Sequence, residues 1–64
     1  MMILGGIHMD LKTMRCKARI TIAKMGLYMK VPRAMIPLWE SGKIQMTQRE
    51  YDKYLQILMD KRVN

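Results

Sequence analysis

The sequence TIAKMGLYMKVPRAMIPLWESGK, residues 21–43, decides the fold. Its first part carries apolar side chains at the i, i+3, i+4 and i+7 spacing that lines one face of a helix. Pro32 pushes the residue before it out of the helical region and suits the first position of a new helix. Near its end stands Gly42, and glycine is a common residue just past a helix C-terminus. These signals predict two helices, 22–30 and 32–41, joined by a short turn.

Two further helices flank this pair. Asp10 is a good N-cap for a helix over 11–18. Thr47 and Glu50 have the spacing of a capping box, in which each side chain satisfies a free backbone donor of the other, at the start of a helix over 48–62. No alternating pattern of a strand competes with these helices. We therefore expect an all-α chain of four short helices.

The length of 64 residues is that of one domain. We expect this domain to span 10–64 and to follow an apolar leader, 1–9, that is disordered or an added extension. The leader is too short to cross a bilayer and lacks the basic start and cleavage site of a signal peptide. Cys16 is the only cysteine, which excludes an intrachain disulfide and is typical of a reduced, cytoplasmic setting.

The charge of the chain predicts a polyanionic partner. Lys and Arg number 12 against 5 acids, which gives a formal net charge of +7. Residues 11–39 contain no acid, and their cations are Lys12, Arg15, Lys17, Arg19, Lys24, Lys30 and Arg33. A basic block of this length serves nucleic acid or an anionic membrane. Gly26, Pro32 and Pro37 interrupt any long amphipathic face, so the sequence favours nucleic acid over a membrane.

The sequence predicts no catalytic, metal or cofactor site. It has no nucleophile–base pair, no metal-ligand spacing, no phosphate-cradling glycine loop and no paired carboxylates. His8 has no partner, and Cys16 is best explained as an incidental thiol. Tyr51 and Tyr54 fall on the apolar stripe of the last helix, which favours core packing over stacking on bases.

Residues 11–43, about half of the chain, resemble the helix-turn-helix part of the Cro/lambda-repressor-like (xenobiotic-response-element) family. The matching positions are Leu11, Met14, Arg15, Ile20, Thr21, Met25, Met29, Val31, Arg33, Ile36, Trp39, Glu40, Ser41, Gly42 and Lys43. The resemblance implies a small four-helix lambda-repressor-like helix-turn-helix domain. It also implies a phage or mobile-element repressor or autorepressor, cytoplasmic and nucleoid-associated, that binds double-stranded DNA at a two-fold operator as a homodimer. Ile57 and the leader are candidates for the dimer surface.

The resemblance also assigns roles by position. In that family the second helix crosses the DNA backbone and the third lies in the major groove. The implied base contacts come from Arg33, Ala34, Met35, Pro37 and Leu38. The implied phosphate contacts come from the backbone near Ile22 and from Arg19, Lys24, Lys30 and Lys43. Arg15 and Glu40 match a buried ion pair that links the first helix to the end of the third.

Five residues depart from the family pattern. Pro32, Ala34 and Pro37 replace the small polar residues of its third helix. Ile22 stands where the family has a glutamine, and Lys30 replaces the glycine of the turn. Pro37 falls inside the helix predicted over 32–41, where it would remove a backbone hydrogen bond at a cost of about 3 kcal/mol. The third helix must therefore bend there, or begin later than the family pattern.

These departures leave a second function open, that of a protein-binding module on a helix-turn-helix that no longer contacts bases. Leu27, Tyr28, Met35 and Leu38 are predicted on the outside, and an exposed apolar patch is typical of a protein contact. Such a module could be an inhibitor, an antagonist of a host nuclease or an antitoxin. The acid-free basic block and Arg33 favour the DNA-binding function instead.

Overall fold

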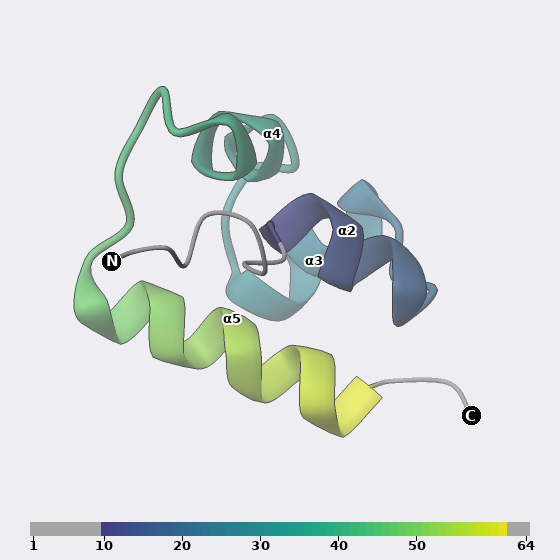
Figure 1. Ribbon diagram of the computed structural model, residues 1–64. Coiled ribbons are helices and arrows are strands. Elements are labelled where there is room, and N and C mark those ends of the chain that lie inside the picture. The colour runs from purple at the N-terminus through teal and green to yellow at the C-terminus, as the bar shows by residue number, and fades with distance from the viewer. Residues whose placement is uncertain (1–9, 62–64) are drawn as a thin grey trace.

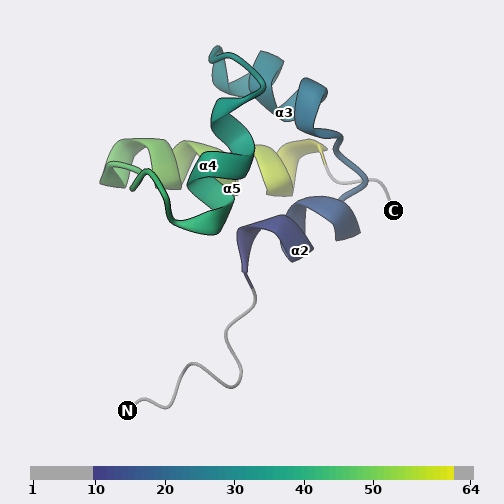
Figure 2. The ribbon, with the colours of Figure 1, turned by 90° about the horizontal axis from the view of Figure 1, so that it is seen from above.

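The computed structural model describes residues 10–61, so the predictions for the leader 1–9 and for the last three residues lie outside the described part of the chain. The helices are α2 (Leu11–Lys17), α3 (Ile22–Met29), α4 (Met35–Ser41) and α5 (Gln48–Lys61). No strand forms between residues 10 and 61. The expected all-α class is therefore confirmed. In Figure 1, α5 lies beneath the other helices, and in Figure 2 it passes behind α4.

Helices α2, α3 and α5 begin where their capping residues predict. Asp10 Oδ1 and Thr21 Oγ1 each accept a hydrogen bond from the backbone N–H three positions later, at 2.8 and 3.1 Å. The backbone N–H of Glu50 donates to Thr47 Oγ1 at 3.1 Å, and the backbone N–H of Thr47 donates to Glu50 Oε1 at 2.8 Å. Both halves of the capping box are thus made, and they fix where α5 starts.

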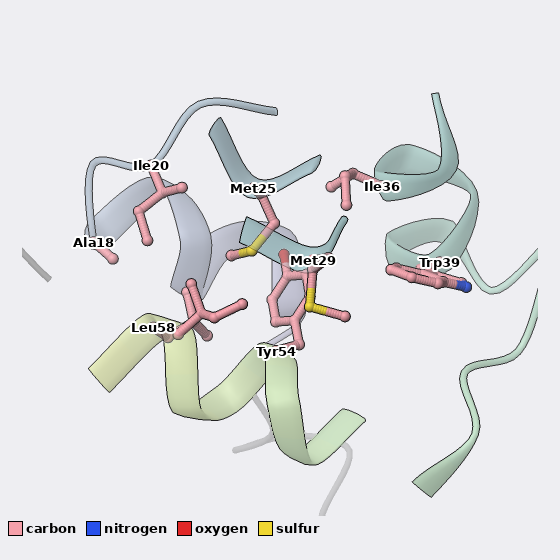
Figure 3. Packing of buried hydrophobic residues seen from close by; sticks show 9 residues of the cluster. Ala18, Ile20, Met25, Met29, Ile36, Trp39, Tyr54 and Leu58 are labelled. Atoms are coloured by element: carbon pink, nitrogen blue, oxygen red, sulfur yellow. The ribbon is translucent and has the colours of Figure 1, made fainter. Parts of the chain in front are cut away.

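The core is formed by side chains from α3, α4, α5 and the α2–α3 connection, which converge above α5 in Figure 3. Its buried members are Ala18, Ile20, Met25, Met29, Ile36, Trp39, Tyr54, Ile57 and Leu58. Met25, Ile36 and Tyr54 are fully buried. Ile57, a candidate for the dimer surface, is only 8% exposed and therefore belongs to the core of this domain.

The prediction that α4 begins at Pro32 is wrong, because the helix begins at Met35. The intervening residues form a turn in which the Met35 backbone N–H donates to Pro32 O at 2.9 Å. This later start places Pro37 in the first turn of the helix, where backbone N–H groups have no partner within the helix. The missing N–H of proline therefore costs little there. Of the two outcomes that Pro37 allowed, the structure has the late start.

Helix α3 ends in a left-handed residue that is not glycine. Lys30 has φ 60° and ψ 44°, and its backbone N–H donates to Leu27 O at 3.2 Å. The backbone N–H of Val31 donates to Gly26 O at 3.0 Å. A glycine would adopt this positive φ without the steric cost of a Cβ, so Lys30 carries that cost.

The turn before α4 passes unusually close to α3 at Gly26. A Cβ atom at this position would lie 3.0 Å from Arg33 Cα and 3.1 Å from Val31 O. Such distances are shorter than ordinary van der Waals contact, so only glycine fits without displacing backbone. Gly26 therefore fixes how close Arg33 lies to α3.

Candidate nucleic-acid interface

A buried polar network fixes α4 against the rest of the domain. Arg15 Nε donates to Glu40 Oε2 at 2.7 Å, and the two side chains are only 6% and 4% exposed. Arg15 Nη1 also donates to Ile20 O at 2.8 Å. The ion pair that the resemblance implied is thus present. The hydrogen bond to Glu40, together with its negative charge, raises the pKa of Arg15 against the opposing effect of burial.

Tyr54 completes this network, and no pattern in the sequence predicts that it does. Its hydroxyl donates to Glu40 Oε2 at 2.6 Å, so one carboxylate oxygen joins α2, α4 and α5. The pattern placed Tyr54 on an apolar stripe but gave its hydroxyl no partner. The hydroxyl of a buried tyrosine usually has a hydrogen-bond partner, and this general rule was the only indication in the sequence that Tyr54 would have one. Burial, and next the hydrogen bond to Glu40, raise the pKa of Tyr54 far above its ordinary value of 10.0.

The raised pKa of Tyr54 predicts a loss of stability in alkali. The unfolded chain releases this proton near pH 10 while the folded chain keeps it, so the stabilisation is complete below about pH 10 and declines above it. We expect the free energy of unfolding to fall by about 1 kcal/mol between about pH 10 and 11 from this group alone. Urea denaturation of the protein and of Tyr54→Phe across this pH range isolates the contribution of Tyr54, because the two proteins share all other titratable groups. Equal pH slopes for the two proteins would contradict the prediction.

The acid-free block becomes an exposed basic surface. Arg15 is buried and paired, whereas the other cations of the block are exposed, namely Lys12, Lys17, Arg19, Lys24, Lys30 and Arg33. None of these exposed cations forms an ion pair with another residue of the range 10–61. They project from α2, α3 and the turns at the ends of these helices. This surface therefore keeps its positive charge available to a polyanion.

The residues implied as base contacts separate into two groups. Arg33 and Ala34 are exposed in the turn that leads into α4, and Pro37 is exposed on the helix. Met35 and Leu38 are half-buried, and Met35 packs against the core. Met35 is therefore a poorer base contact than the resemblance implied, because part of its side chain is committed to packing.

The residues implied as phosphate contacts lie before α3, on it, between it and α4, and after α4. Arg19, Lys24, Lys30 and Lys43 are all exposed, and Lys43 follows the left-handed Gly42 that ends α4. Ile22 opens α3 but is half-buried against the core. A shallow hollow beside it is lined by two acids, Asp10 and Glu40, and by one base, Lys12. The start of α3 is therefore less positive than the neighbouring exposed cations would suggest.

The predicted apolar patch is smaller than expected. Of its four members only Leu27 is strongly exposed, at 74%, whereas Tyr28, Met35 and Leu38 are half-buried. Tyr28 packs against the core and lies under Lys61, whose Nζ is 5.0 Å from the centre of the ring. The expectation that all four side chains face outward is therefore wrong, because three of them are half-buried and two of these pack against the core.

Within residues 10–61, no cluster of His, Cys, Asp and Glu could hold a metal ion, and no helix is long and apolar enough to cross a membrane. The chain matches no family model, no curated protein and no solved structure. Its function must therefore be argued from the basic surface and the geometry of α3 and α4.

Proposed function

We propose that the chain is a small DNA-binding transcriptional regulator, a repressor or autorepressor of the phage or mobile-element type. The observation that carries this proposal is the exposed Arg33 just before α4, in a stretch of sequence, 11–39, that holds seven cations and no acid. Arg33 stands just ahead of a helix that packs on α3 and is tied to the core through Glu40. A guanidinium presented in this way can bond guanine O6 and N7 together.

In the proposed complex, α4 approaches the major groove of duplex DNA and α3 crosses the backbone. Lys30 is exposed in the connection between the two helices, and Lys43 is exposed just past the end of α4. Both can bind phosphates without contributing to sequence recognition. The protein would act as a homodimer on a two-fold operator with half-sites about one helical turn apart. Because Ile57 is buried in the core, the dimer surface must be formed by other residues.

We expect Arg33→Ala and Lys43→Ala to impair DNA binding in different ways. Arg33→Ala should weaken binding to the preferred duplex by about 1–3 kcal/mol and relax preference at one base pair. Lys43→Ala should weaken binding to all duplexes alike and reduce the salt dependence by about one unit of slope. Gel-shift titrations at two salt concentrations measure both effects, with random-sequence duplex and the DNA upstream of the gene as probes.

The matched control is Lys53→Ala, which removes an exposed cation on α5, outside the acid-free block. It should leave preference and affinity nearly unchanged. Preference for the upstream DNA that survives the higher salt supports the proposal. If neither Arg33→Ala nor Lys43→Ala changes binding, this docking mode is wrong.

A second candidate function, a protein-binding module, is favoured by one observation. Leu27 is 74% exposed on α3, next to the basic surface, and an exposed large apolar side chain can anchor a protein contact. Weak, equal binding to every duplex that disappears with salt would mean that the basic surface acts only electrostatically. The candidate partner would then be an acidic protein, as for an inhibitor or an antitoxin.

A further inference from the structure

The outward face of α4 carries almost no group that can hydrogen-bond a base. Ala34, Pro37, Leu38 and Ser41 follow the i, i+3, i+4, i+7 spacing on the side away from the buried Ile36 and Trp39. The first three are apolar. The hydroxyl of Ser41 donates to Leu38 O at 3.2 Å and accepts from the Lys43 backbone N–H at 3.4 Å, so it is already engaged within the helix end.

Cations stand at both ends of this apolar face. Arg33 is exposed just before the helix, and Lys43 is exposed just after the glycine that ends it. An apolar protein partner alone would leave these cations uncompensated, whereas the phosphates of a duplex would neutralise them. The cations at both ends therefore favour a polyanion, which under the proposed function is duplex DNA, and the apolar face between them determines which bases it can contact. The acids Asp10 and Glu40 line a hollow at one side of this face, beside Pro37 and Ser41.

In the major groove, thymine is the base that offers an apolar group, its C5-methyl, to a protein side chain. Helix α4 has 7 residues, and at about 1.5 Å of rise per residue it covers roughly three base pairs. We infer that α4 recognises a short thymine-rich stretch through methyl contacts of Ala34, Pro37 and Leu38, beside one guanine bonded by Arg33. This inference rests on the proposed function and names the DNA sequence class that the same surface would select.

The test compares two randomised duplex pools made from the same templates, one with thymine and one with uracil in its place. Uracil keeps base pairing and removes only the methyl group. The protein should bind the thymine pool more tightly, by roughly 4-fold for each methyl contacted and therefore by roughly 15- to 60-fold for two or three. In Leu38→Ala this ratio should fall several-fold. In Leu27→Ala, which removes the same atoms from an exposed site on α3, it should stay as in the unchanged protein.

Each outcome decides one point. Equal affinity of the unchanged protein for both pools would overturn methyl recognition and leave DNA binding itself intact. A preference for thymine that Leu38→Ala retains in full would also overturn it, because the preference would then come from the shape of the duplex. Circular dichroism checks that Leu38→Ala remains folded, and Pro37→Ser, at an exposed position, serves as a second variant with the same expectation. Failure to bind either pool would overturn the proposed function together with this inference.

Discussion

Glu40→Ala is expected to lower the free energy of unfolding by about 3–5 kcal/mol. The substitution leaves the guanidinium of Arg15, only 6% exposed, without its opposing charge. It also leaves the hydroxyl of Tyr54 without an acceptor in the core, since the 2.6 Å hydrogen bond to Glu40 is lost. A domain of this size is stable by only about 3–10 kcal/mol. Much of the variant should therefore be unfolded at room temperature.

Urea denaturation followed by circular dichroism measures this loss. Glu50→Ala is the matched control, because it removes a carboxylate whose hydrogen bond, to the backbone N–H of Thr47, is exposed. It should cost only about 1 kcal/mol. A double variant, Arg15→Met with Glu40→Leu, should be more stable than Glu40→Ala, because it strands no charge in the core. A loss for Glu40→Ala as small as that for Glu50→Ala would contradict the role assigned to the network.

Only part of the buried polar network could be predicted from the sequence. Arg15 and Glu40 are 25 positions apart, so no local pattern joins them, and only the resemblance to a family pattern paired them correctly. Tyr54 is not among the positions that resemble the family pattern, so its hydrogen bond to Glu40 could not be predicted in this way. Its partner depends on how α5 is placed against α4, which is a tertiary fact that neither periodicity nor capping encodes.

The start of α4 shows the opposite case, because two local signals in the sequence, Pro32 and Pro37, conflict and only one of them places the helix correctly. Pro32 suits the first position of a helix, and this suggested a start at residue 32. Pro37 argued against that start, because a proline is tolerated only in the first turn of a helix. A helix that begins at Met35 accommodates both prolines, because Pro32 then precedes the helix and Pro37 lies in its first turn. In the helix that results, Met35 is half-buried and packs against the core.

Gly26→Val is expected to lower the free energy of unfolding by about 3 kcal/mol, near the upper end for overpacking. A Cβ there would already lie 3.0 Å from Arg33 Cα, and the methyl groups of valine add further atoms toward the backbone of the turn. Because the Val31 backbone N–H bonds to Gly26 O at 3.0 Å, the turn cannot move away without breaking that bond. The better helix propensity of valine over glycine, a few tenths of a kcal/mol, does not offset this cost.

Ala23→Val is the matched control for this prediction, since Ala23 is exposed on the same helix and gains the same β-branched side chain. It should cost less than about 1 kcal/mol. Gly26→Ala should fall between the two, because its gain in helix propensity of about 1 kcal/mol opposes the contact of a single Cβ. Under conditions where Gly26→Val is still folded, it should also bind DNA less selectively than Ala23→Val, since the displaced turn carries Arg33. Equal stability and equal selectivity of the two valine variants would show that the close approach at Gly26 neither fixes the turn nor positions Arg33.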